Sequence, residues 1–273
     1  MAQLKKTENQ QINKTLPLLS IITVVRNCEE TIEETILSII NQNYQNIEYI
    51  IIDGMSTDNT LDIIKKYEKH ITYWVSEPDK GIYDAMNKGI QLATGDWINF
   101  MNAGDEFFNL EICSLIQNST DSVEFDVVYG NFLAIQKDSE AKILIKAKPI
   151  HKIIEGMVFC HQSVFIKREL LILEPFNLNF KIVADYHQML SLYFNKYKFQ
   201  YVPLTISKID IGGISYSNKN TTLETIKVIH SFKPYSILIL KKVPYLILHE
   251  IGSLLGNRYT SYFRRLKWRL KSK

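Results

Sequence analysis

The sequence is poor in the residues on which several familiar site chemistries depend. Its 273 residues include three cysteines, Cys28, Cys113 and Cys160, which lie far apart and form no CxxC pair. A sparse and odd set of this kind indicates reduced thiols in a cytosolic protein rather than a disulfide framework. The six histidines are scattered, and no combination of cysteine and histidine has the spacing of a zinc site.

Three common catalytic and nucleotide-binding signatures are missing as well. The segment VVRNCEET, which follows the first apolar run, has no glycine, whereas a GxGxxG dinucleotide site needs glycines there. No GxxxxGK(S/T) stretch is present, which disfavours a P-loop ATPase, and no GxSxG stretch supports a serine hydrolase. The residue types that remain for chemistry are carboxylates and hydroxyls.

Long apolar runs are also absent. No run reaches the ~18 residues that span a bilayer. The stretch MAQLKKTENQQINKT is polar and lacks the apolar centre of a signal peptide, so residues 1–15 are expected to form a flexible arm. Apolar residues make up 46% of the chain, which is enough for a packed core.

Charge is divided unevenly along the chain. The net charge of +3 conceals a C-terminal segment, residues 217–273, with 12 Lys and Arg against 2 Asp and Glu. That segment carries +10, which leaves −7 for residues 1–216. The shift indicates an acidic body with a basic tail, and it places a domain boundary near residue 216.

The basic tail contains the pattern of an amphipathic helix, although Trp268 interrupts its apolar face. Such a helix either lies on an anionic membrane surface or packs on the body with its basic side in water, and the sequence leaves both open. Nucleic acid is not an expected partner, because no DNA- or RNA-binding motif accompanies the charge. The apolar positions are Tyr259, Tyr262, Phe263, Leu266 and Leu270, and the basic positions are Arg264, Arg265, Lys267, Arg269 and Lys271.

Strand and helix patterns alternate through the first half of the chain. Predicted strands are 18–25, 47–53, 71–79 and 97–101, and predicted helices are 29–41, 82–93 and the stretch marked by Leu61, Ile64 and Tyr67. The continuous apolar runs are typical of parallel strands that are buried on both faces. The second half is less regular, with predicted strands at 125–132, 141–147 and 199–209, a strand entering a helix at 161–170, and a helix at 184–194. The pattern predicts an open α/β sheet, which binds ligands beyond the carboxyl ends of its strands.

Polar side chains cluster where the first four predicted strands end. Any one of them has a simpler interpretation as a turn residue or helix cap, because these residue types favour such places. Four clusters in succession instead predict one shared crevice, in which Asp53 accepts a hydrogen bond from a base or a ribose and Asp105 binds a hard divalent cation. The clusters are Thr23 with Arg26 and Asn27, then Asp53, then Asp79, then Asn102 with Asp105.

Two stretches carry a resemblance to a known family. PLLSIITVVRNCEETIEETILSIINQNYQNIEYIIIDGMSTDNT and SEPDKGIYDAMNKGIQLATGDWINFMNAGD look like the start of a family 2 glycosyltransferase, from about Pro17 to Asp105. The likeness continues more weakly through HQSVFIKREL and FKIVADYHQML to ISKIDIGGIS. It implies the GT-A fold, a Rossmann-like open mixed sheet flanked by helices, with a nucleotide-binding half at about 16–105 and an acceptor half at about 106–216. It also implies transfer of a sugar from a nucleoside-diphosphate sugar, with a UDP-sugar the expected donor, and inversion at the anomeric carbon.

The resemblance also implies a role for each matching residue. Asp105, at the close of NAGD, would coordinate Mg²⁺ or Mn²⁺, and Asp185, in ADYH, matches the acid assigned as the general base. Asp185 has an alternative as a helix cap, since it stands near the start of a predicted helix. The nucleotide-sugar would be contacted by Asp53 at the uracil or ribose, by Thr23, Arg26 and Asn27 around the base, and by Asp79 and Asn102.

The sequence departs from the family pattern at the metal. Many relatives have two acids in this motif, as in DxD or DD, whereas Asn102 and Gly104 leave Asp105 alone. One carboxylate and the pyrophosphate oxygens can hold the cation, but weakly without substrate. His161 is a candidate further ligand, against the alternative of a structural histidine.

The sequence therefore predicts a cytoplasmic transferase that works at the inner face of the cell membrane on a glycan or a lipid-linked glycan. The rival interpretation is a non-catalytic GT-A module that binds a nucleotide-sugar or a partner enzyme. Its support is the missing second acid.

Overall fold

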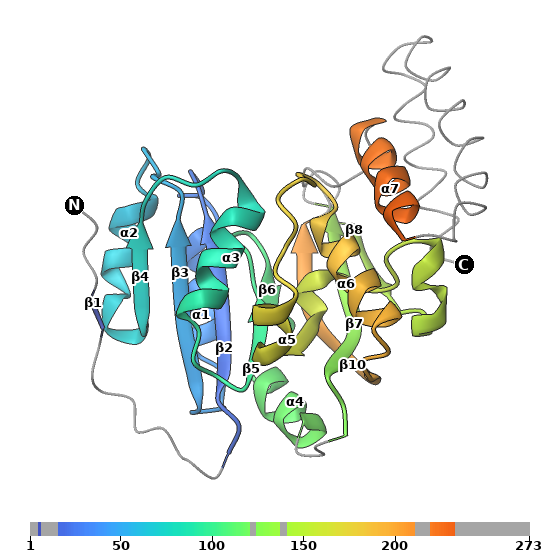
Figure 1. Cartoon of the computed structure of the whole chain (residues 1–273). Helices are drawn as coiled ribbons and strands as arrows, with labels where there is room; N and C mark the ends of the chain where they lie inside the picture. The colour runs from blue at the N-terminus through green and yellow to red at the C-terminus, as the bar shows by residue number, and fades with distance from the viewer. Residues whose placement is uncertain (1–4, 7–15, 121–123, 137–140, 211–218, 233–273) are drawn as a thin grey trace.

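The computed structural model describes residues 5–6, 16–120, 124–136, 141–210 and 219–232 (Figure 1). Its centre is a mixed sheet whose strands lie in the order β1-β4-β3-β2-β5-β9-β7-β10-β6, with β8 paired to β7. The predicted open mixed sheet flanked by helices is confirmed.

Four parallel strands form the N-terminal half of the sheet. They are β2 (Leu19–Val25), β3 (Ile47–Asp53), β4 (Tyr73–Ser76) and β5 (Trp97–Phe100). Every residue of β2, β3 and β5 is buried, which is why these stretches are mainly apolar in the sequence. In the register, Val25 lies beside Asp53 and Asp53 beside Ser76, so the carboxyl ends of three strands meet at one edge.

The remaining strands mix directions. Strand β9 (Val164–Lys167) runs antiparallel between β5 and β7 (Val127–Gln136), and β7 runs parallel to β10 (Phe199–Asp210). The two-residue strands β6 (Glu106–Phe107) and β1 (Lys5–Lys6) pair antiparallel with β10 and β4, and β8 (Ala141–Ile145) pairs antiparallel with β7. Strand β1 is the described part of the predicted N-terminal arm.

Helices cover both faces of the sheet and bury two apolar layers. One layer contains residues of α1 (Ile32–Ile40), α2 (Thr60–Lys66) and α4 (Ile112–Thr120). The other contains residues of α3 (Ile82–Leu92), α5 (Arg168–Leu173), α6 (Ala184–Phe194) and α7 (Lys219–Ser231). Strand β2 contributes side chains to both layers because successive side chains of a strand point to opposite faces. Short 3₁₀ segments at Glu68–His70, Ile150–Glu155 and His161–Ser163 complete the described elements.

Helix α7 comes from the sequence range assigned to the basic tail, but it packs into the body. Its Val228 and Ile229 are 0% and 2% exposed and belong to the same apolar layer as α6. None of the helices in the described ranges is long and apolar enough to cross a membrane. The predicted amphipathic helix beyond residue 258 lies outside the described residues, as do residues 1–4 and 7–15 of the arm.

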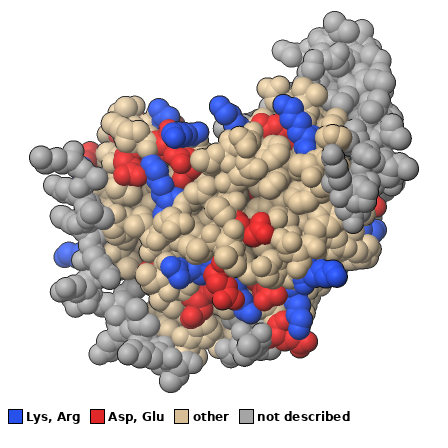
Figure 2. All heavy atoms as spheres, viewed as in Figure 1, with Lys and Arg blue, Asp and Glu red and all other residues tan. Residues whose placement is uncertain are grey.

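On the face of the molecule that Figure 2 shows, acidic and basic side chains lie close together rather than in separate blocks. Several of the charged groups of the body are paired, such as Lys167 with Asp126 at 3.0 Å and Lys88 with Glu77 at 2.8 Å.

Candidate active site

The loops that follow β2 and β3 are tied together by hydrogen bonds. The backbone N–H of Asn27 donates to Ser56 Oγ at 2.8 Å, and the Asn27 side-chain oxygen accepts from the Thr57 N–H at 2.8 Å. Asn27 has a φ of 51°, a left-handed conformation that asparagine tolerates better than most residues. The Arg26-Asn27 turn and the STDNT loop, residues 56–60, are therefore joined into one polar rim.

The Asp53 carboxylate supports this polar rim through hydrogen bonds. Its carboxylate is 0% exposed and accepts three hydrogen bonds, from the N–H and the hydroxyl of Ser56 and from the hydroxyl of Ser76. The structure thus places Asp53 at the predicted strand end, where it joins the loop after β3 to the end of β4. Any effect of Asp53 on a nucleotide includes the position of that loop.

Arg26, Gly54 and Asp79 lie close together at the end of β3. A side-chain carbon added at Gly54 would lie 2.3 Å from a carboxylate oxygen of Asp79 and 3.4 Å from Cδ of Arg26. A side chain at position 54 would therefore displace the Asp79 carboxylate, and glycine leaves room for it. Asp79 also accepts a 2.8 Å hydrogen bond from the Gly81 N–H at the start of α3. The ends of the first three strands thus lie together at one edge of the sheet, and the roles of these residues in nucleotide binding stay a prediction.

Thr23 has a different position from these residues. Its hydroxyl is 0% exposed, donates to the Met101 carbonyl at 2.7 Å and lies 3.1 Å from the Tyr49 hydroxyl. These contacts hold the end of β5 against β2. The structure thus places Thr23, predicted to line the base pocket, in the buried interior between neighbouring strands.

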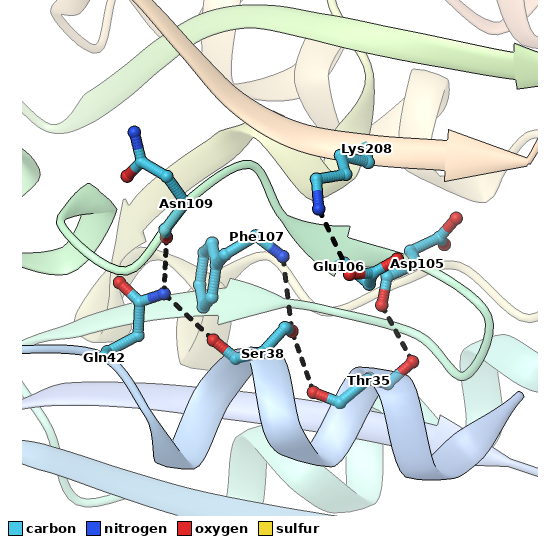
Figure 3. Close-up of polar contacts among 8 residues, drawn as sticks. All are labelled: Thr35, Ser38, Gln42, Asp105, Glu106, Phe107, Asn109 and Lys208. Atoms are coloured by element: carbon cyan, nitrogen blue, oxygen red, sulfur yellow. Dashed lines mark hydrogen bonds and ion pairs between the residues drawn. The ribbon is translucent and has the colours of Figure 1, made fainter.

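The NAGD segment is held against α1 by a single hydroxyl. The Gly104 N–H donates to Thr35 Oγ1 at 3.0 Å, and this hydroxyl donates to the Asp105 carbonyl at 2.8 Å. Gly104 has a φ of 94°, which side-chain-bearing L residues rarely adopt, so glycine permits the turn that presents Asp105. Figure 3 shows the Asp105 carboxylate pointing away from α1, while Glu106 pairs with Lys208 at 3.3 Å.

Gln162 orients the Asp105 carboxylate. The Gln162 amide nitrogen donates to Asp105 Oδ2, and its amide oxygen accepts from the Cys160 thiol. Burial, and to a smaller extent the charges of Asp105 and Asp185, raise the pKa of the Cys160 thiol, so it stays protonated and can donate. The two acids that the sequence singled out for metal and base thus both lie near the turn at residues 160–162.

His161 links Asn102 to Asp185. Its Nδ1 lies 3.7 Å from an Asp185 oxygen, and its Nε2 lies 3.1 Å from the Asn102 amide nitrogen. Burial lowers the pKa of His161 despite the opposing effect of Asp185, so the ring is neutral near pH 7. A proton on Nδ1, facing the carboxylate, leaves Nε2 to accept from Asn102. The amide oxygen of Asn102 is then buried without a hydrogen-bond partner among the described residues.

Asp185 is the second residue of α6, and the capping position before the helix is occupied by Val183. Its Oδ1 accepts a 3.0 Å hydrogen bond from the Tyr83 hydroxyl, on α3. The Asp185 side chain is 19% exposed, so a substrate can reach the carboxylate. The capping alternative is thus not what this carboxylate does in the structure.

Sequence reasoning missed Gln162 and Tyr83. Both lie inside stretches that carry the family resemblance, HQSVFIKREL and SEPDKGIYDAMNKG. Neither belongs to a polar cluster at a strand end, and their partners are 57 and 102 positions away in the chain. The HQS stretch could have drawn attention to Gln162, since three consecutive polar residues directly before a buried strand are unusual.

Comparison with known proteins identifies the family. Residues 20–178, more than half of the chain, match the family described as glycosyl transferase family 2, so the chain belongs to that family. The match ends before α6, and Asp185 therefore lies outside it. The assignment made from the sequence is confirmed.

Two relatives illustrate the sequence similarity. A PGL/p-HBAD biosynthesis glycosyltransferase of Mycobacterium bovis is 29% identical over 175 residues, which cover 62% of this chain and 67% of the relative. A glycosyltransferase of Haemophilus influenzae, named as uncharacterized, is 28% identical over 253 residues, which cover 88% of this chain and 98% of the relative.

Solved structures share the fold. S. aureus TarS in complex with UDP-GlcNAc has a TM-score of 0.65 at 18% identity, and the match covers 78% of this chain and 66% of TarS. The mannosyltransferase PcManGT of Pyrobaculum calidifontis, in complex with GDP-Man and Mn²⁺, has a TM-score of 0.61 at 15% identity and covers 97% of this chain and 89% of that one. At these identities the likeness shows the GT-A fold, and this chain spans about two thirds of the TarS structure.

Proposed function

We propose that this protein is a metal-dependent, inverting glycosyltransferase that moves a sugar from a UDP-sugar to an acceptor hydroxyl. The observation that carries the proposal is the meeting of Asp105 and Asp185 around residues 160–162. Asp105 contacts Gln162, and Asp185 lies beside His161. Helix α3 connects this site to Asp79, because Asp79 accepts from the N–H of Gly81, just before α3, and Tyr83, in its first turn, donates to Asp185. Family membership and the nucleotide-sugar complexes of the structural neighbours support this class of reaction.

Inversion requires one displacement step. The oxygen of the acceptor hydroxyl attacks the anomeric carbon and forms the new glycosidic bond. The bond from that carbon to the phosphate oxygen breaks on the opposite face, and UDP leaves with the electron pair. The hydroxyl proton passes to the Asp185 carboxylate, which acts as the general base. Tyr83 orients one oxygen of that carboxylate, while the other faces neutral His161.

The residues around Asp105 fit a hard divalent cation. Asp105 would supply a carboxylate oxygen, and the buried, unpartnered amide oxygen of Asn102 is suited to be a second ligand. Within the described ranges, no group of three or more His, Cys, Asp or Glu residues could hold a metal ion, so the remaining ligands would be substrate phosphates and water. When bound there, Mg²⁺ or Mn²⁺ would supply positive charge to offset the negative charge of the diphosphate leaving group.

The acceptor and the place of action belong to the same proposal. A glycan or lipid-linked glycan at the inner face of the cell membrane is supported by the 12 basic against 2 acidic residues of segment 217–273, since anionic lipid surfaces attract such segments.

Release of UDP tests the proposal against a non-catalytic module. Purified protein is incubated with UDP-GlcNAc, UDP-glucose, UDP-galactose and GDP-mannose, where water can replace a missing acceptor, and the released diphosphate is measured. We expect release from a UDP-sugar, loss of release with EDTA, and its return with excess Mn²⁺ or Mg²⁺. Binding of a UDP-sugar without release from any donor would support the rival module, and release that persists in EDTA would contradict the metal requirement.

A separate measurement addresses Asp53. Replacement of Asp53 by Ala should weaken UDP affinity by about 1–3 kcal/mol, the cost of leaving polar partners unpaired. The matched control is Ser76→Ala, which removes one hydrogen bond but keeps the carboxylate. Calorimetric titration with UDP distinguishes the two roles. Weakening in Asp53→Ala alone indicates a role of the carboxylate beyond its bond to Ser76, at the nucleotide or through the Ser56 loop. Weakening in both variants indicates an effect through the bond to β4, and unchanged affinity in both contradicts any role in binding.

A further inference from the structure

The segment just before α6 is held by a carboxylate from α7. The N–H groups of three consecutive residues, 181–183, all donate to the Glu224 carboxylate, at 3.1 Å for Lys181, 2.8 Å for Ile182 and 3.3 Å for Val183. Hydrogen bonds to an ionised carboxylate are about twice as strong as those between neutral groups. Glu224 therefore does, from another helix, what a capping residue does at a helix N-terminus.

The same segment is held from its other side by α3. The Ile182 carbonyl accepts a 2.8 Å hydrogen bond from the Tyr83 hydroxyl, which also lies 3.0 Å from Asp185 Oδ1. Burial, and then the nearby charge of Asp185, raise the pKa of Tyr83 well above its ordinary value, so the hydroxyl keeps its proton. The Ile182 peptide is thus clamped between Tyr83 and Glu224, three residues before Asp185.

Apolar packing fixes the position of Glu224. Val228 lies one helical turn after Glu224 on the same side of α7 and is 0% exposed. At the end of α7, the ring of Phe232 lies 5.2 Å from His187 and 5.2 Å from Phe194, both on α6. Helices α6 and α7 are thus packed against each other, with the Glu224 carboxylate bonded to the segment before α6.

We propose that Glu224 is a positioning residue for Asp185, so that α7 belongs to the catalytic unit although its sequence range begins the basic segment. The proposal rests on the proposed function, in which Asp185 is the general base. Glu224 touches neither substrate nor metal in this scheme. It acts by holding the backbone of residues 181–183, and with it the carboxylate that must meet the acceptor hydroxyl. A misplacement of about 1 Å at a reacting group can cost on the order of 10²-fold in rate.

The test compares Glu224→Ala with Lys227→Ala, an exposed position on the same helix. UDP release from the UDP-sugar most active with the wild-type protein gives kcat and KM, and calorimetry gives UDP affinity. For Glu224→Ala we expect kcat to fall by roughly 10–100-fold, with KM and UDP affinity within about twofold of wild type. Glu224→Gln, whose amide oxygen can still accept, should recover part of the loss. Lys227→Ala should match the wild type.

Tyr83→Phe gives a second variant that leaves α7 intact. It removes the hydroxyl from Ile182 and Asp185 while the ring can keep its contact with Phe176, 5.2 Å away. We expect the same fall in kcat at unchanged KM, and non-additive losses in the double variant with Glu224→Ala, because both act on one peptide.

Two results overturn the inference. One is a Glu224→Ala protein with wild-type kcat. The other is a loss of kcat matched by an equal loss of UDP affinity or of folded protein in both variants, which would make the clamp a general support of the fold. A wild-type protein that releases UDP from no donor would instead refute the proposed function, and this inference with it.

Discussion

Asp105→Asn is expected to reduce UDP release by roughly 10³-fold or more, because charge stabilisation at the leaving group contributes several kcal/mol. The substitution keeps the shape and an oxygen that can accept from Gln162, so the local hydrogen bonds can survive. It removes the only charge that the NAGD segment offers to a cation. Activity with saturating Mn²⁺ and Mn²⁺ binding in the presence of UDP are the two measurements.

Glu106→Gln is the matched control for Asp105→Asn. Glu106 is the next residue, is also acidic and pairs with Lys208 rather than with the site (Figure 3). We expect this variant to keep most of its turnover and its Mn²⁺ binding. Normal turnover in Asp105→Asn would show that the cation is held elsewhere or is not needed.

Asp185→Asn should reduce turnover by roughly 10²–10⁴-fold, the usual contribution of a positioned base. A base acts on the acceptor hydroxyl only in the transition state, so UDP affinity and its metal dependence should stay close to wild type. The Asn oxygen can still accept from Tyr83, which keeps the first turn of α6 in place. The readouts are kcat, UDP affinity by calorimetry and the thermal midpoint.

Glu169→Gln, on α5 in the same half of the molecule, is the control for Asp185→Asn, because Glu169 is an exposed acid. Preserved turnover in Asp185→Asn would mean that another group takes the proton. A parallel loss of UDP binding and of thermal stability would place Asp185 in the scaffold.

The strands of the nucleotide half were predictable because burial on both faces leaves a strong and simple signal. The run IEYIIID became β3 at the predicted bounds, and the strand predicted at 18–25 became β2, Leu19–Val25. The insertion of β9 between β5 and β7 was not predictable, since its partners lie far away in the chain and a four-residue strand carries no mark of direction. The two-residue strand β6 and helix α4 were missed for the related reason that their patterns are short or irregular.

The residues of the site also fall into those that the sequence identified and those that it did not. Asp53, Asp79 and Asp105 were identifiable because polar residues directly after apolar strands stand out, and because the carboxyl ends of parallel strands meet at one edge. The likeness to family 2 supplied Asp185. No comparable sequence pattern identified Gln162, Tyr83 and Glu224, since each acts through a partner more than 40 positions away.

By itself, the sequence determined the parallel half of the sheet and the acids at its strand ends, because these depend on local composition and periodicity, and its likeness to family 2 glycosyltransferases indicated the family. Only the tertiary structure decided which acids share a site and what orients them. It also decided that α7 is part of the body, because the net charge of a segment records its average composition and not the face that it buries. Val228 and Ile229 lie against the core, and Glu224 reaches the segment before Asp185. Such contacts arise from the packing of distant helices, and no spacing within the chain encodes them.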